Sequence, residues 1–120
     1  MNNERQAVIN AWLCIAKRYL TNPYLILEFL NEPYNGNPIL TNNASGYSLD
    51  QLTDNYVAFS QQAISTLRAN GIKSLISLDA AFSSAPYFSA TYFPDVNDQN
   101  TIWERHAYAP TISEWKSCLD

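Results

Sequence analysis

The sequence predicts an α/β fold with parallel strands, and three observations support that prediction. Helical and extended segments alternate along the 120 residues, which is the order expected of βαβ units. The segment Tyr24 to Asn31 is almost continuously apolar, as in a parallel strand that is buried on both faces. Two of the expected strands lead into a carboxylate, Glu32 and Asp79, at the end of a strand where ligands usually bind in such folds.

The first helix is expected from Asn3 to Thr21. Four large apolar residues recur at i, i+4, i+7 and i+11, which places them on one face of the helix: Val8, Trp12, Ile15 and Tyr19. The helix should end at Thr21, because Asn22 precedes Pro23 and the residue before a proline avoids the right-handed α region.

The second helix has clear signals at both ends. Ser48 and Gln51 have the spacing of a capping box, and Gly71 can adopt the left-handed conformation that ends a helix. Its predicted apolar face consists of Leu52, Tyr56, Phe59, Ala63 and Leu67. The preceding segment, Tyr34 to Tyr47, reads as a polar loop, and unstructured loops of this length are usually functional.

Two further strands are expected at Ile72–Asp79 and Thr101–Tyr108, and another helix should begin at Thr111. The aromatic segment Ala80–Pro94 is harder to interpret and is compatible with a short helix. The length fits one domain over residues 1–120.

Composition excludes several functions. The net charge of −4 argues against a nucleic-acid partner, because no basic surface exists to neutralise phosphates. No apolar run is long enough for a membrane span, and the polar N-terminus does not resemble a signal peptide. Cys14 and Cys118 are expected to be buried free thiols. His106 is the only histidine and no metal-ligand spacing occurs, so we expect neither metal nor cofactor.

The candidate site begins at Asn31-Glu32-Pro33. Pro33 cannot donate to a β-ladder, so the strand should stop there and leave an amide and a carboxylate at its end. Glu32 is therefore a candidate catalytic residue, although it could instead cap the following loop or pair with an arginine.

His106 and Tyr108 are candidates for the same reason, because they lie at the end of the third expected strand. Alternation places them on one face with Glu104. A lone histidine can also be purely structural, and this alternative stays open.

A second catalytic carboxylate is not evident. Glu28 and Glu32 should lie about 13 Å apart along an extended strand, which exceeds either separation used in glycoside hydrolysis. Glu104 is expected to form a structural ion pair, and Asp79 to orient a neighbour or cap the loop. The sequence thus offers one convincing acid without a partner.

Together, four segments resemble glycoside hydrolase family 5, the cellulase-type family. The first three, Ile15–Tyr19, Asn22–Ile26 and Phe29–Pro33, are similar to the helix before strand 4 and to strand 4 with its terminal Asn-Glu-Pro. His106-Ala107-Tyr108 matches the His-x-Tyr at the end of strand 6. The resemblance spans nearly the whole chain.

The resemblance implies that residues 1–120 are part of a (β/α)8 barrel, covering strands 4 to 6. A full barrel has about 250 residues. Glu32 would be the general acid/base, Asn31 would bind the sugar 2-hydroxyl, and His106 and Tyr108 would line the subsite at the scissile bond. Glu28 would pair with an arginine inside the barrel.

The implied activity is retaining hydrolysis of β-1,4-linked glucans. In this family the nucleophilic glutamate follows strand 7, which these residues lack, so we expect the chain alone to be inactive. The expected partners are a polysaccharide or oligosaccharide, and either the missing barrel segments or a second copy at the open sheet edges. The localisation of the chain is unknown, and the parent protein is expected to be secreted.

Two alternatives remain. The chain could be a non-catalytic carbohydrate-binding or interaction remnant that uses Tyr34, Tyr47 and His106 as a sugar platform. It could also be an unrelated α/β domain in which Asn-Glu-Pro occurs by coincidence.

Overall fold

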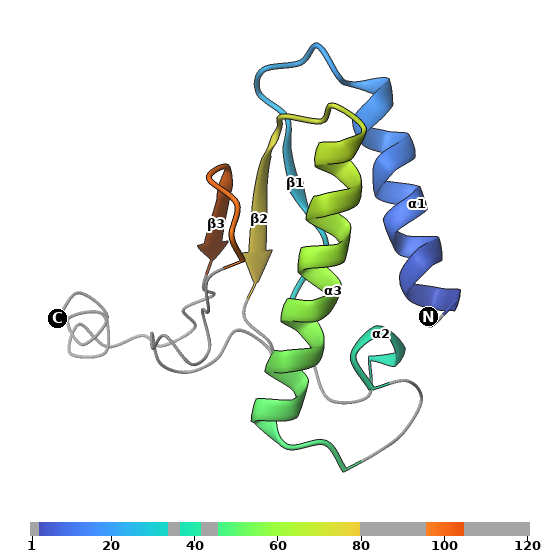
Figure 1. Ribbon diagram of the computed structural model, residues 1–120, viewed down its shortest axis with the longest axis vertical. Coiled ribbons are helices and arrows are strands. Elements are labelled where there is room, and N and C mark those ends of the chain that lie inside the picture. The colour runs from blue at the N-terminus through green and yellow to red at the C-terminus, as the bar shows by residue number, and fades with distance from the viewer. Residues whose placement is uncertain (1–2, 34–36, 42–45, 80–95, 105–120) are drawn as a thin grey trace, which may run out of the picture.

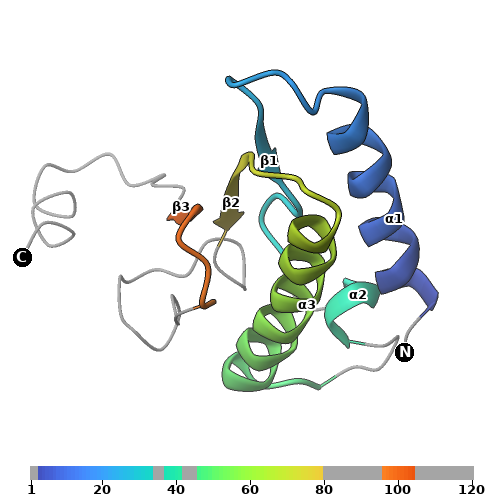
Figure 2. The ribbon, with the colours of Figure 1, turned by 45° about the horizontal axis from the view of Figure 1, so that its top comes forward.

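A computed structural model describes residues 3–33, 37–41, 46–79 and 96–104 of the chain. The elements are α1 (Asn3–Arg18), β1 (Ile26–Glu28), α2 (Pro38–Thr41), α3 (Leu49–Ala69), β2 (Leu75–Asp79) and β3 (Thr101–Glu104). The strands form one parallel sheet in the order β1-β2-β3, with α1 and α3 on the same side of it (Figure 1). The turned view in Figure 2 shows the same layering. The predicted α/β fold with parallel strands is confirmed.

The register of the sheet divides its residues between two faces. Leu27 pairs with Ile76, so both face the helices, where each is at most 1% exposed. Ile26 on the opposite face is 56% exposed, and Ile102 on the same face is 46% exposed. The prediction that the first strand is buried on both faces is therefore wrong at Ile26. The exposed positions on this face lie in the two outer strands, β1 and β3, whereas Ser77 in the central strand is 3% exposed on the same face.

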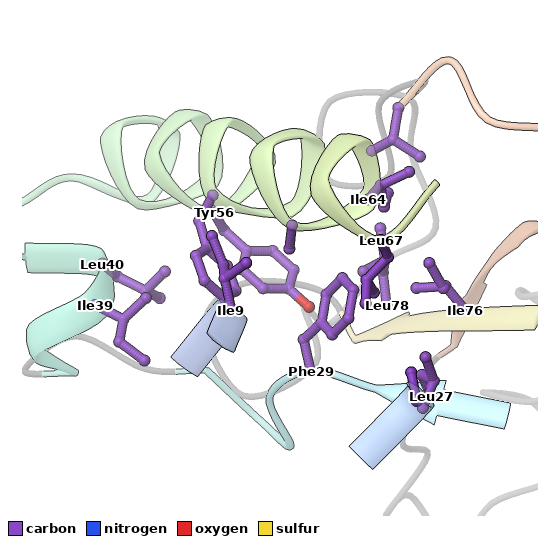
Figure 3. Close-up of a cluster of buried hydrophobic side chains, with 14 of the residues drawn as sticks. Ile9, Leu27, Phe29, Ile39, Leu40, Tyr56, Ile64, Leu67, Ile76 and Leu78 are labelled. Atoms are coloured by element: carbon purple, nitrogen blue, oxygen red, sulfur yellow. The ribbon is translucent and has the colours of Figure 1, made fainter. Parts of the chain in front are cut away.

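α3 supplies more of the hydrophobic core than any other described element. The five residues predicted to form its apolar face are all buried, and the Ser48–Gln51 capping box is present in both directions. Gly71 after the helix has φ 78°, as its role at the helix end requires. Figure 3 shows side chains from α1, α2, β1 and β2 meeting the underside of α3. Each large side chain buried there stabilises the fold by about 1.5–3 kcal/mol.

α1 packs with only part of its predicted face: Val8 and Trp12 pack against the core, but the other two residues do not. Ile9 and Ala16 are fully buried, while Ile15 and Tyr19 are 41% and 47% exposed. Trp12 packs against the core, and its indole N–H donates to the carbonyl of Phe29 at 3.2 Å. The small side chain of Ala16 allows the helix to approach its neighbours closely, which turns the larger Ile15 and Tyr19 outward.

Cys14 also lies on the outward side of α1 and is exposed. The prediction of a buried thiol is therefore wrong for Cys14, because the packing of α1 turns this position toward solvent. Cys118 lies outside the described residues.

The predicted polar loop contains a short helix, α2. Asn37 begins it by accepting a hydrogen bond from the Ile39 N–H at 3.0 Å, and Pro38 takes the first helical position. The Leu40 carbonyl accepts from Asn55 Nδ2 at 2.7 Å, which ties α2 to α3. The Asn-Pro pair was the sequence signal for this helix. Residues 34–36 and 42–45 lie outside the described part.

Other expected boundaries differ by a few residues. α1 ends at Arg18 rather than Thr21, and β2 begins at Leu75 rather than Ile72. β3 is described only to Glu104, so the second half of the third expected strand, the aromatic segment Ala80–Pro94 and the helix from Thr111 are outside the described residues. In the described part of the chain, no helix combines the length and hydropathy that a membrane crossing needs.

Arg68 connects the end of α3 with the turn before β3. Its guanidinium donates two hydrogen bonds to Asp98, at 2.8 and 2.9 Å, and further ones to the carbonyls of Ile72 and Ser74. Asp98 also accepts from the Thr101 hydroxyl at 2.9 Å. Chiefly through the Arg68 hydrogen bonds, the pKa of Asp98 is lowered from 3.8 to about 2.

This cluster yields the first testable prediction. Asp98→Asn should lower the free energy of unfolding near neutral pH by about 1–3 kcal/mol, because charge-assisted hydrogen bonds to Arg68 are lost. The folded-state pKa is the lower one, so the stabilisation is present above about pH 4 and disappears as the pH falls toward 2. Urea unfolding between pH 7 and pH 2 measures both effects.

Asp54→Asn is the matched control, because Asp54 is an exposed residue on α3. If the difference in unfolding free energy between wild type and Asp98→Asn were the same at pH 7 and at pH 2, the role of the Arg68–Asp98 pair would be contradicted.

Candidate functional site

The candidate site lies at the carboxyl edge of the sheet, which we define as the C-terminal ends of β1, β2 and β3. β1 ends at Glu28, with Glu32 four residues further along the chain, and β2 ends at Asp79. Because the strands are parallel, these ends meet at one edge of the sheet. The fold therefore brings the segment after β1 next to the end of β2.

Glu32 has an unusual backbone conformation. Its φ is 45°, in the left-handed region that residues with a Cβ rarely occupy. The next residue is the buried Pro33, which further restricts the backbone of Glu32. The residue is half-buried. Strain of this kind persists only where surrounding contacts enforce it, and it is concentrated at functional sites.

Asp79 provides one such contact. Its Oδ2 accepts a hydrogen bond from the Glu32 backbone N–H at 2.7 Å, and the residue is 0% exposed. Asp79 was predicted to orient a neighbour or to cap the loop, and the structure shows that its carboxylate contacts the backbone of Glu32. Asp79 also pairs with Glu104 across β2 and β3, so its backbone is fixed by the sheet.

Tyr56 on α3 lies beneath this edge. It is 0% exposed, and burial raises the pKa of its hydroxyl well above the ordinary value, with a further upward contribution from the charge of Asp79. Its ring packs edge-on against Trp103, with centroids 6.1 Å apart. Tyr56 is therefore a neutral phenol in the core, and it helps to fix the end of β2 rather than to exchange protons.

A second group of polar side chains lies on the sheet face away from the helices, further from the carboxyl edge than Glu32. The Ser77 hydroxyl donates to Glu104 Oε2 at 2.5 Å, and Glu28 pairs in register with Ser77. The ion pair expected for Glu104 and the arginine expected for Glu28 stay predictions. The contact with Ser77 shows that the Glu104 carboxylate points along the sheet toward β2.

Of the other predicted site residues, the structure describes Asn31 but not His106 or Tyr108. Asn31 is exposed next to Glu32. His106 and Tyr108 lie outside the described residues, so their predicted meeting with Glu32 stays a prediction. Across the described ranges, no group of three or more histidine, cysteine or acidic side chains could hold a metal ion. The sequence placed Asp79 at a strand end, but it did not predict the contact between Asp79 and Glu32.

The arrangement can perform proton transfer. A half-buried carboxylate follows a parallel strand, and its backbone is held by a fully buried carboxylate from the next strand. Such a group can donate or accept a proton at a ligand bound over the sheet edge.

Comparison with known proteins agrees with this geometry. The family model described as Cellulase (glycosyl hydrolase family 5) matches residues 1–119. Among solved structures, the chain is similar to a GH5-4 broad specificity endoglucanase from Clostridium acetobutylicum, with a TM-score of 0.63 and 22% sequence identity. The match covers 88% of this chain and 33% of that one, so the chain spans about a third of its length. A search of curated proteins found no match.

The backbone of Glu32 gives a second prediction. Glu32→Gly should be more stable than Glu32→Ala by about 1 kcal/mol, because glycine accepts a positive φ without steric cost. Urea unfolding of the two variants measures the difference.

Asn31 provides the control, since it is not among the residues with positive φ. There the order should reverse, with Asn31→Ala more stable than Asn31→Gly. If the alanine variant were more stable than the glycine variant at both positions, Glu32 would not be strained.

Proposed function

Because the chain belongs to glycosyl hydrolase family 5, the cellulase family, we propose that it supplies the acid/base half of a retaining β-1,4-glucan hydrolase. The observation that carries the proposal is the position of Glu32. It follows a parallel strand of a partial (β/α) barrel, and the C-terminal face of such barrels holds the active site. The backbone strain at Glu32 and its hydrogen bond with Asp79 support the same assignment.

In the proposed mechanism Glu32 acts twice. Its protonated carboxyl first gives a proton to the glycosidic oxygen as the bond to the anomeric carbon breaks and a separate carboxylate attacks that carbon. The resulting Glu32 carboxylate then takes a proton from the water that releases the sugar from the covalent intermediate. Two steps with inversion give overall retention.

The nucleophile is proposed to lie outside these residues. It should be about 5–5.5 Å from the acid/base carboxyl in a retaining enzyme. Asp79 is a poor candidate, because it is fully buried and its Oδ2 already accepts from Glu32. Glu28 is four residues from Glu32 on the same segment, about 13 Å away if extended.

The remaining roles follow the family pattern. We propose that Asn31 binds the sugar 2-hydroxyl near the reacting carbon, and that His106 and Tyr108 line the subsite at the scissile bond. The exposure of Asn31 next to Glu32 supports its access to a ligand. The substrate would be a polysaccharide or oligosaccharide, and secretion of the parent protein would give it access to an insoluble polymer.

The rest of the barrel, or a second copy of the chain, is proposed to pair with the sheet edges. In the described residues β1 and β3 each pair on one side only, and the exposed Ile26 and Ile102 lie on the face that a complete barrel would cover. The similar endoglucanase is about three times longer, which supports completion by further barrel segments.

The binding-only alternative has less support. It requires a platform of exposed aromatic rings that includes Tyr47, but Tyr47 is partly buried and packs against the hydrophobic core. Tyr34 and His106 lie outside the described residues.

Activity of the 120-residue chain alone is the third prediction. It should release no reducing sugar from carboxymethylcellulose or from an aryl β-cellobioside, because the nucleophile is not among its residues. Turnover that Glu32→Gln abolishes would contradict the missing nucleophile. We call the chain joined to the remaining barrel segments of its parent protein the completed barrel. If wild type and Glu32→Gln both bind cello-oligosaccharides, and the completed barrel hydrolyses none, the binding-only alternative is favoured.

The fourth prediction concerns leaving groups in the completed barrel. Glu32→Gln should slow hydrolysis of a natural glucan by about 10²–10⁴-fold, because its leaving group needs a proton. It should affect an aryl β-cellobioside with an acidic phenol much less, because that leaving group departs as an anion. Initial rates on both substrates give the comparison.

Glu4→Gln is the control, since Glu4 is an exposed residue in the first turn of α1. If Glu32→Gln slowed hydrolysis of both substrates by the same factor, a role for Glu32 in leaving-group protonation would be contradicted.

A further inference from the structure

A hydrogen bond links two segments that are far apart in the chain. The donor is the backbone N–H of Glu32 and the acceptor is Asp79 Oδ2, 2.7 Å away and 47 positions further along the sequence. The bond therefore reports the relative position of the loop after β1 and the end of β2. It holds Glu32 through the backbone N–H, so the bond acts on the main chain and not on the carboxyl.

The acceptor side of this bond is rigid. Asp79 is the last residue of β2, is 0% exposed and pairs in register with Glu104. Tyr56 lies close enough for the charge of Asp79 to raise the pKa of its hydroxyl. A buried carboxylate held by the sheet and by α3 has few alternative orientations.

The donor side is strained. Glu32 has φ 45°, and in the right-handed or extended regions its N–H and its Cβ would both point in other directions. A charge-assisted hydrogen bond is of the size needed to offset such strain. The positive φ of Glu32 sets the direction of its side chain, and the hydrogen bond to Asp79 maintains that φ.

We propose that Asp79 is a positioning residue for Glu32. By accepting the Glu32 N–H it holds this residue in the left-handed conformation and so aims the Glu32 carboxyl over the sheet edge. The proposal rests on the proposed acid/base role of Glu32 for its catalytic meaning, while the positioning itself can be measured without activity. Asp79 acts through Glu32 and does not touch the substrate.

The test uses nuclear magnetic resonance on the ¹⁵N-labelled 120-residue chain. A residue with positive φ has its amide and α protons close together, so Glu32 should show a strong intraresidue amide–α cross-relaxation signal. The signal should weaken in Asp79→Ala and persist in Asp79→Asn, whose side-chain oxygen can still accept. The Glu32 amide should also exchange with solvent about tenfold faster in Asp79→Ala, equivalent to about 1.4 kcal/mol.

Asp54→Asn, at an exposed position of α3, should leave all these signals unchanged. An unaltered Glu32 signal in a folded Asp79→Ala chain would overturn the proposal, because a merely structural Asp79 could change stability but not the φ of Glu32.

Should Asp79→Ala fail to fold, acidification of Glu32→Gln replaces it, because residue 32 then has no carboxyl of its own to titrate. Protonation of Asp79 should move the amide-proton resonance of residue 32 in this variant, and the movement should be absent when Asp79→Asn is added. The same movement with Asp79→Asn present would overturn the proposal.

Kinetics in the completed barrel separate the positioning role of Asp79 from the proposed acid/base role of Glu32. Asp79→Ala should lower kcat by about 10²-fold with a smaller change in KM, since misplacing a catalytic group by about 1 Å has that effect. Asp79→Asn should restore most of the rate. If Glu32→Gln leaves hydrolysis unchanged while the resonance signals behave as predicted, the proposed function fails and the positioning stands.

Discussion

The packing of α3 against the sheet is the constraint on which the rest of the structure depends. Leu52, Tyr56, Phe59, Ala63 and Leu67 form one fully buried stripe, so the helix must lie along the face of the strands. A helix that crosses over in this way makes β1 and β2 parallel. Their C-terminal ends then meet at one edge, and this is what places Glu32 beside Asp79.

The elements themselves could be predicted because their signals are local. A capping box, a 3.6-residue period and a glycine after the helix all lie within α3, and the structure has each of them. The face of α1 could not be predicted from its period alone. Whether Ile15 or Ala16 is buried depends on how closely the neighbouring elements approach, and the sequence of α1 does not contain that distance.

The candidate site was predictable to a similar degree. A strand expected to run from Tyr24 to Asn31 and to stop at Pro33 indicated a carboxylate at a sheet edge. β1 ends earlier, at Glu28, and Glu32 follows it in the loop at that edge. The contact between Asp79 and Glu32 depends on strand register, which involves residues 47 positions apart. Burial of the first strand on both faces was also a non-local prediction. It fails at Ile26, which is 56% exposed, because the sequence of one strand does not contain what covers each of its faces.

The site illustrates how strain can be retained where it serves function. An αL conformation at a residue with a Cβ costs about 1–2 kcal/mol, and a glycine at position 32 would avoid that cost. Glycine would also remove the carboxyl. In the proposed positioning, the buried acceptor Asp79 on the neighbouring strand offsets part of this cost through its hydrogen bond to the Glu32 N–H.

The central claim is that Glu32 is the acid/base and that the nucleophile comes from another part of the barrel. The most direct measurement is covalent labelling of the completed barrel with a 2-deoxy-2-fluoro-β-cellobiosyl fluoride, followed by peptide mass spectrometry. The account predicts a label on a carboxylate outside residues 1–120 and none on Glu32. A label on Glu32 would make it the nucleophile and would contradict the account.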